Sequence, residues 1–115
     1  MPDYRTGQNT TIGVVATDAA LAKVHTLKIA QMAHDGMARA IRPAHTMFDG
    51  DSIFCLSTGQ KKLPQASGSY MDPHAQHLSE LGHAAANCLS RAIIHGVLNA
   101  HSLAGMTAFV DLDDL

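Results

Sequence analysis

The residue whose type and position most clearly suggest a catalytic role is a threonine at the start of a β-branched segment. Asn9-Thr10-Thr11 directly precedes an apolar run, so Thr10 begins a segment that we expect to be a buried strand. If the bond between Asn9 and Thr10 is cut, the new α-amino group of Thr10 can serve as the base for its own hydroxyl, and no histidine is required. An α-amino group has an ordinary pKa of about 7.7 to 8.0, so part of it can accept a proton near neutral pH. The alternative is an ordinary turn followed by residues of high β-propensity.

Two carboxylates, Asp49 and Asp51, flank Gly50 just before a second apolar run. Side chains two residues apart share a face of an extended chain, so both carboxylates can point to one site. There they could orient an amine and hold their pKa values apart. The alternative is a polar turn in which the aspartates accept turn hydrogen bonds and Gly50 adopts a positive φ. A calcium loop matches poorly, because the downstream acidic ligands are missing.

The eight histidines of the chain do not form a convincing set of metal ligands. His74 and His77 are three residues apart and could share one face of a helix, but no third ligand is evident. Further along, His83, His95 and His101 are expected to face solvent or to cap backbone groups. We therefore expect no zinc site, and no motif requires a cofactor.

The other nucleophile types carry no recognisable motif. Cys55 and Cys88 lie among apolar neighbours and are expected to be buried thiols; a disulfide between them is possible but unsupported. Ser57 and Ser90 lack the Gly-x-Ser-x-Gly elbow of the α/β-hydrolases, and no glycine-rich phosphate loop is present. These observations exclude the enzyme classes that depend on those motifs.

The segments that must position the candidate site alternate between strand and helix. Residues 10–17 are β-branched and apolar on both faces, which is typical of an interior strand, and residues 52–58 form a second apolar run. Between them, apolar residues recur at steps of three and four from Asp18, a candidate helix cap, to Pro43. Gly36 inside this helix indicates a close approach between the helix and the sheet.

The second half of the chain is expected to add one more long helix. Residues 60–69 have the composition of an exposed connector, and Asp72-Pro73 is a helix start with a cap followed by proline in the first turn. The apolar stripe of that helix continues to about Asn99. Residues 106–110 are expected to form a short strand before the acidic tail, residues 111–115. The pattern predicts an α/β fold with two long helices packed on β-strands.

Composition limits the class of protein further. The sequence has 115 residues and a mass of 12.2 kDa, about one domain. Hydrophobic residues make up 46% and charged residues 16%, against a typical charged share of about 25%, so most of the chain can pack. The 8 basic and 10 acidic residues provide no cationic surface for nucleic acid. No apolar run approaches the roughly 20 residues of a membrane helix, and the start lacks a signal-peptide pattern. We expect a cytoplasmic protein without a nucleic-acid or membrane partner.

Three segments, in their order and spacing, resemble one family. They are Asn9–Asp18, Ala33–Pro43 and His45–Phe54. They are similar to the C-terminal, β-subunit part of the DmpA-like L-aminopeptidase/D-esterase family, which includes the nylon-oligomer hydrolases. The resemblance covers residues 9–59 closely and the rest more loosely. It implies a precursor that cuts itself before a serine or threonine, leaving α and β chains in a four-layer α-β-β-α sandwich.

The resemblance also implies roles for individual residues. The processed bond would be Asn9–Thr10, and Thr10 would be the N-terminal nucleophile, as in the nylon-oligomer hydrolase branch. Asp49 and Asp51 align with the acidic or hydroxyl pair that the family places beside the nucleophile. The implied reaction is hydrolysis of an amide in a peptide or small molecule through an acyl-enzyme, with oxyanion donors from the α part. Residues 1–9 would end an α-like segment, and residues 10–115 would be the β-subunit-like portion of one peptidase domain.

The α part is where the sequence departs from the family. The precursors are several times this length before the cleavage point, whereas Met1 stands only nine residues upstream of Thr10. The faces left open are expected to be covered by an α-subunit-like segment or by self-association. The alternative is a non-catalytic truncated relic, or a small oligomerising α/β module with the Asn9–Thr10 bond intact. The residues do not distinguish L-, D- or β-amino acid amides from nylon oligomers as substrates.

Overall fold

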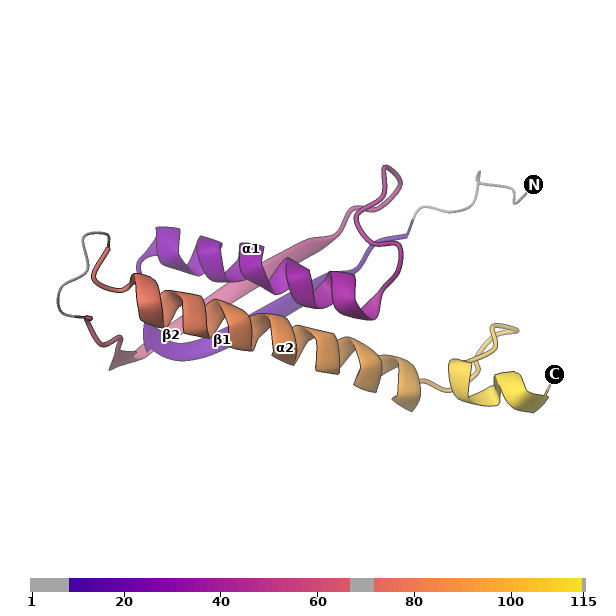
Figure 1. Cartoon of the computed structure of the whole chain (residues 1–115). Helices are drawn as coiled ribbons and strands as arrows, with labels where there is room; N and C mark the ends of the chain where they lie inside the picture. Colours follow the sequence, from indigo (N-terminus) through magenta and orange to yellow (C-terminus); the bar gives the residue numbers. More distant parts are fainter. Residues whose placement is uncertain (1–8, 67–71, 115) are drawn as a thin grey trace.

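The computed structural model describes residues 9–66 and 72–114, in which strands and helices alternate (Figure 1). The predicted α/β class is confirmed, while residues 1–8 of the predicted α-like segment, residues 1–9, lie outside the described residues. The elements are β1 (Ile12–Ala20), α1 (Lys23–Ala40), β2 (Ser52–Lys62), α2 (Ala75–Asn99) and a short 3₁₀ helix, η2 (Phe109–Asp114).

The two strands form a parallel pair. Ile12 lies opposite Ser52, and the register is regular up to Thr17 opposite Ser57, after which it shifts. At the shift, the Ser57 hydroxyl donates to the Ala19 carbonyl at 2.6 Å and accepts the Leu21 N–H at 3.2 Å, so the irregular backbone keeps its hydrogen bonds. Because the strands are parallel, their amino ends lie at the same edge of the sheet, and the segments that precede them meet there.

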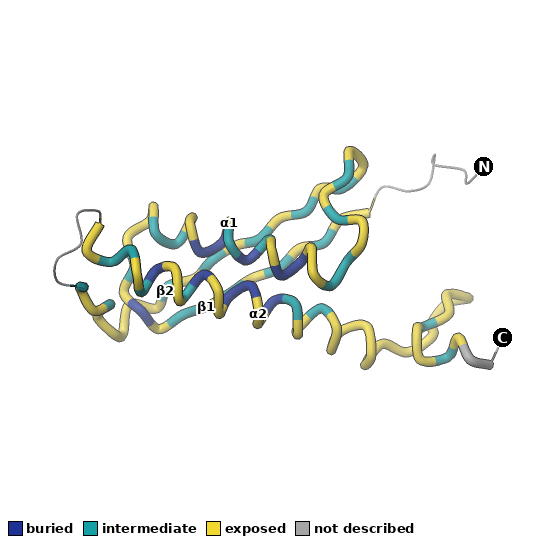
Figure 2. The backbone as a smooth tube through the Cα atoms, viewed as in Figure 1, coloured by how far each residue is buried: buried dark blue, intermediate teal, exposed yellow. Residues whose placement is uncertain are grey.

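Both helices lie on one face of the sheet and pack against each other. Figure 2 shows the buried residues concentrated along the line where α1 and α2 run side by side. Val15, Ile53 and Cys55 reach this core from the strands. The core cluster itself consists of Ile29, Ala33 and Met37 from α1 and Leu78, Ala85 and Leu89 from α2.

The opposite face of the sheet is exposed, although it is apolar. Ile12 and Val14 of β1 are 71% and 66% exposed, and Phe54 and Leu56 of β2 are 63% and 56% exposed. The prediction of an interior strand covered on both faces is therefore wrong for β1 in this chain. The residue types are those of a covered strand, but the described residues provide a cover on one side only.

Both strands extend further toward their carboxyl ends than the sequence predicts, and β1 begins at Ile12 and not at Thr10. Asp18 does not cap a helix: it lies in β1 and pairs with Lys61 of β2 at 3.0 Å, and α1 begins only after Ala22. Similarly, residues 60–62 belong to β2 and not to the connector predicted over residues 60–69, whose part from 67 on lies outside the described residues. Cross-strand pairing extended both strands into polar residues that local propensity assigns to caps and loops.

Gly36 marks a close approach between two helices, so the predicted contact with the sheet is wrong. A Cβ built on Gly36 would lie 2.0 Å from the backbone oxygen of Ala86 in α2. The helical period correctly identifies the apolar stripe of α1 but not the element that packs on it. Here α2 shares the same face of the sheet and occupies that position.

The predicted second helix is confirmed, and the predicted last strand is wrong. Asp72 accepts the His74 N–H at 2.8 Å, but α2 begins at Ala75 with His74 at its N-cap, so the predicted start at Asp72-Pro73 is too early. The helix ends at Asn99, as predicted. Residues 106–110 form no strand: Met106 makes an isolated bridge to Leu103, and a 3₁₀ helix begins at Phe109. Of the helices that the structure describes, none is both long and apolar enough to cross a membrane.

Candidate active site

Thr10 lies at the amino edge of the parallel pair, next to the segment that leads into β2. The backbone N–H of Gly50 donates a hydrogen bond to the Thr10 hydroxyl oxygen at 3.3 Å. The two segments are close: a Cβ built on Gly50 would lie 3.0 Å from that oxygen. Thr10 is exposed, so its hydroxyl is both held by a backbone donor and open to a reactant.

Asp51 anchors the residue that follows Thr10. Its Oδ1 accepts the Thr11 N–H at 3.0 Å, and its Oδ2 accepts the backbone N–H of His45 at 3.1 Å and contacts the His45 ring Nδ1 at 2.7 Å. The Asp51 side chain is only 7% exposed. The hydrogen bond from Thr11 lowers the pKa of Asp51 most, and the bonds from His45 lower it further. Asp51 is thus a carboxylate that holds the start of β1 by its backbone.

Asp49 closes the loop before β2. Its Oδ2 accepts the Thr46 backbone N–H at 2.9 Å and the Thr46 hydroxyl at 2.7 Å, and its own N–H donates to the Thr46 carbonyl at 3.1 Å. These are the turn hydrogen bonds of the alternative interpretation. The positive φ of that interpretation falls elsewhere in the described chain, on His45 at 58° and not on Gly50.

The structure therefore brings Thr10, Asp49 and Asp51 to one edge, but it gives the two carboxylates different partners. Within the contacts among described residues, neither carboxylate binds the Thr10 hydroxyl, which the Gly50 N–H binds instead. Asn9, the other residue of the predicted processing bond, is exposed beside Thr10. The processing and catalytic roles assigned to these residues remain predictions.

Sequence reasoning missed two histidines at this edge. The His45 ring Nε2 lies 3.2 Å from Nδ1 of His34 in α1, and the rings meet edge to face with their centres 4.8 Å apart. His45 stands six residues before Asp51 in the same motif. A signal was available, because a histidine close to a carboxylate in a short loop is well placed to bind it.

The other histidines do not gather into a site. His83, His95 and His101 are exposed, as expected. His74 has its ring Nδ1 3.4 Å from the Pro64 carbonyl, and the buried Nδ1 of His77 has no hydrogen-bond partner among the described residues. In the described ranges, no group of three or more histidine, cysteine or acidic side chains is arranged to hold a metal ion.

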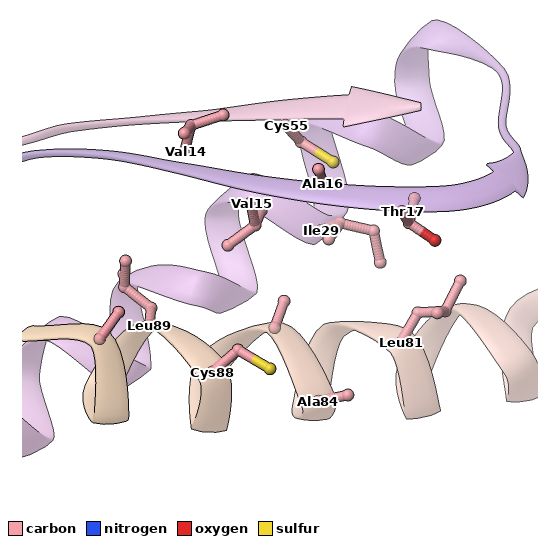
Figure 3. Close-up of a pocket in the computed structure, with 12 residues that line it drawn as sticks. Val14, Val15, Ala16, Thr17, Ile29, Cys55, Leu81, Ala84, Cys88 and Leu89 are labelled. Atoms are coloured by element: carbon pink, nitrogen blue, oxygen red, sulfur yellow. The ribbon is translucent and has the colours of Figure 1, made fainter. Parts of the chain in front are cut away.

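An apolar cavity of about 260 Å³ lies between β1 and α2, away from Thr10 (Figure 3). Its walls include both cysteines, which are free. Cys55 is half-buried, and burial raises the pKa of its thiol, but Cys88 is exposed, so the prediction of two buried thiols is wrong for Cys88. Cys88 belongs to α2, and the described residues form no strand on the other side of β1 that would cover it. Without converging polar groups, this cavity is a packing gap and not a candidate active site.

The chain is similar to known proteins over most of its length. The sequence model of Peptidase family S58 matches residues 2–110, which is nearly the whole chain. This chain belongs to Peptidase family S58. The predicted resemblance to the DmpA-like family, with its aminopeptidases and nylon-oligomer hydrolases, is confirmed.

Two relatives show how similar the chain is to known proteins of this kind. The chain is 48% identical over 111 residues to an uncharacterized aminopeptidase of Mycobacterium tuberculosis, covering 95% of this chain and 32% of the relative. It is 30% identical over 94 residues to the 6-aminohexanoate-oligomer endohydrolase of a Kocuria species, covering 82% of this chain and 26% of the relative. The chain therefore spans about a third or less of the length of these relatives.

Proposed function

We propose that this S58 chain supplies the nucleophile of a self-processing amidohydrolase, and that Thr10 is that nucleophile. The observation that carries the proposal is the Gly50 N–H bound to the Thr10 hydroxyl oxygen at 3.3 Å, at the exposed amino edge of the parallel strands. A donor on this oxygen fixes the hydroxyl and leaves its proton free for a base. Cleavage of the Asn9–Thr10 bond would place that base, the new α-amino group, on the same residue.

The residues around Thr10 have separate tasks in this mechanism. The Thr10 hydroxyl attacks the substrate carbonyl, and its α-amino group takes the proton and returns it to the leaving amine. Asp51 fixes the backbone of Thr11 through the 3.0 Å bond to its N–H, and so fixes the direction in which Thr10 leaves the strand. Asp49 makes the loop rigid through Thr46, which places the Gly50 N–H. Water then hydrolyses the acyl-enzyme.

The substrate class that we propose is an amide in a peptide or in a small molecule. The names of the relatives support this choice, since one is an aminopeptidase and another acts on oligomers of 6-aminohexanoate. The groups that select among such amides would lie around Thr10, where this chain would face its partner segment.

The partner that we propose is an α-subunit-like segment that covers the outer face of the sheet. The apolar residues Ile12, Val14, Phe54 and Leu56 are each more than half exposed there, which is unusual for adjacent strands of a folded protein. The relatives extend well beyond the matched region, so they contain enough chain to supply such a cover. The four-layer sandwich implied by the family resemblance is consistent with it.

The test is the N-terminus of the purified chain. We expect intact mass and N-terminal sequencing to reveal a new terminus at Thr10 once the chain is mixed with the upstream segment of the mycobacterial relative. Thr10→Ala abolishes this product, whereas Thr107→Ala, which changes an exposed threonine between α2 and η2, leaves it unchanged. A full-length mass in every sample would overturn the proposal.

The exposed sheet face also favours a second function, that of a small oligomerising module without hydrolase activity. Two copies could cover each other's outer faces through the same apolar residues. The same samples decide between the two functions, because this module gives a stable homo-oligomer in which the Asn9–Thr10 bond stays intact.

A further inference from the structure

We propose that His45 is a positioning residue of the Thr10 site, which clamps Asp51 onto the Thr11 N–H and is itself held by His34. This inference rests on the proposed function of Thr10 and assigns to the site two residues besides Thr10, Asp49 and Asp51.

The first observation is that His45 binds Asp51 twice. Its backbone N–H donates to Asp51 Oδ2 at 3.1 Å, and its ring Nδ1 lies 2.7 Å from the same oxygen. His45 makes these two bonds with a φ of 58°, in the left-handed region that residues other than glycine rarely occupy. A strained backbone that serves two bonds to one carboxylate oxygen is a conformation that the loop maintains against its local preference.

The second observation is that Asp51 connects His45 to the backbone that leads from Thr10 into β1. Oδ2 of Asp51 is taken by His45, and Oδ1 accepts the Thr11 N–H at 3.0 Å. The adjacent Gly50 N–H donates to the Thr10 hydroxyl oxygen. A rotation of the Asp51 carboxylate would therefore release the backbone on which Thr10 sits and would shift the donor that holds the Thr10 hydroxyl.

The third observation is that His34 fixes the other side of the His45 ring. When Nδ1 of His45 donates to Asp51, its Nε2 is free to accept a proton from Nδ1 of His34 at 3.2 Å. If His45 gains a proton, its Nε2 becomes the donor and His34 the acceptor, so the contact persists in both charge states. The titratable groups in contact with His45 are Asp51 at the entry to β2 and His34 from α1, while Asp49 of the same loop binds Thr46 instead.

The structure contains a matched control at the other end of α1. His25 contacts Asp72 through its Nε2 at 2.9 Å, and Asp72 also accepts a backbone N–H, that of His74. This pair has the same chemistry as His45 and Asp51, but it joins the start of α1 to the start of α2, away from Thr10.

The experiment measures the rate at which the Thr10 terminus forms in this chain combined with the upstream segment of the mycobacterial relative. We expect His45→Asn, which tolerates the left-handed backbone but lacks the ring, to slow processing by about tenfold to a hundredfold. His25→Asn keeps the rate of the parent.

A second pair of variants leaves His45 in place and decides the question if His45→Asn does not fold. We expect His34→Ala to slow processing, and His34→Gln, whose amide can still donate to Nε2 of His45, to restore most of the rate. Equal rates for the parent, His34→Ala and His45→Asn would overturn the role of His45 and leave the proposed function standing. A parent chain that never yields the Thr10 terminus would instead overturn the proposed function, and this inference with it.

Discussion

The interface between the two helices and the amino edge of the sheet each depend on a glycine, but for different reasons. A Cβ on Gly36 would meet the Ala86 backbone oxygen at 2.0 Å, inside a layer of buried apolar side chains. A Cβ on Gly50 would meet the Thr10 hydroxyl oxygen at 3.0 Å, in a loop in which most residues are half-buried or exposed. One glycine lets two backbones approach, and the other lets a backbone donor reach a side chain.

The two glycines lie in regions with different roles. The interface between the helices stabilises the fold, and the amino edge of the sheet is where we expect the chemistry. Contacts between α1 and α2 are made by apolar surface, whose burial is the main favourable term in folding. Contacts at the amino edge are hydrogen bonds to Asp49, Asp51 and the Thr10 hydroxyl, which fix direction more than they add stability. A single methyl group placed in each region should therefore change different measurements.

Gly36→Ala is expected to have the largest effect on stability. The new methyl group collides with the backbone of α2, which cannot rotate away, so the helices must separate and lose core contacts. Overpacking of this kind lowers the free energy of unfolding by about 3 kcal/mol. The better helix propensity of alanine offsets at most about 1 kcal/mol of this loss. Urea unfolding followed by circular dichroism measures this loss.

Gly82→Ala in α2 is the matched control for that prediction. The closest atom to its Cβ is the flexible end of Met32, the sulfur at 2.2 Å, which can move aside more readily than a backbone oxygen. We expect a clearly smaller loss of stability than for Gly36→Ala. Equal losses for the two variants would mean that the backbone contact at Ala86 is not what limits the interface.

Gly50→Ala is expected to affect processing and not stability. Its methyl group displaces the Thr10 hydroxyl by a few tenths of an ångström or pushes the Gly50 N–H away from it. We expect formation of the Thr10 terminus to slow by about tenfold. The unfolding free energy should stay within about 0.5 kcal/mol of the parent, because the position is exposed. A large loss of stability with normal processing would contradict the distinction between the two regions.

Acidification is expected to act on both His–Asp pairs. The pKa of Asp51 lies below its ordinary value of 3.8, chiefly through the Thr11 N–H, and that of Asp72 lies below 3.8, chiefly through the His74 N–H. The unfolded chain therefore takes up protons at a higher pH than the folded chain, and stability falls as the pH drops below about 4. Asp51→Asn and Asp72→Asn should each reduce the amount of unfolding free energy that is lost between about pH 5 and pH 3, as measured by urea unfolding. A loss identical to that of the parent in both variants would contradict this account.

Gly96→Ala is expected to have the smallest effect, and to be stabilising. No atom lies within 4 Å of a Cβ at this position in α2, so the methyl group meets nothing. Replacing glycine by alanine in an exposed helix interior raises the free energy of unfolding by about 0.5 to 1 kcal/mol. Thermal unfolding should therefore shift upward without a change in processing, and a downward shift would indicate that this face of α2 is covered.

Much of this arrangement could be predicted from the sequence because it depends on local patterns. The spacing of apolar residues identifies both helices, and the β-branched runs identify both strands. The strand-helix-strand order makes a parallel pair the expected connection, which is enough to bring Thr10 near the Asp49–Asp51 segment. The boundaries at Asp18 and Gln60 were predicted wrongly, since cross-strand pairing, which is not local, extends both strands through polar residues.

The partners of each side chain were decided by the tertiary structure. Spacing alone places Asp49 and Asp51 on one face, but it cannot show that one carboxylate binds Thr46 while the other binds Thr11 and His45. Hydrogen bonds of this kind depend on backbone turns, here the left-handed conformation of His45, and on a ring that α1 brings from eleven residues upstream. Local propensity determines which elements form, whereas the contact between Thr10 and Gly50 exists only because folding joins segments forty residues apart.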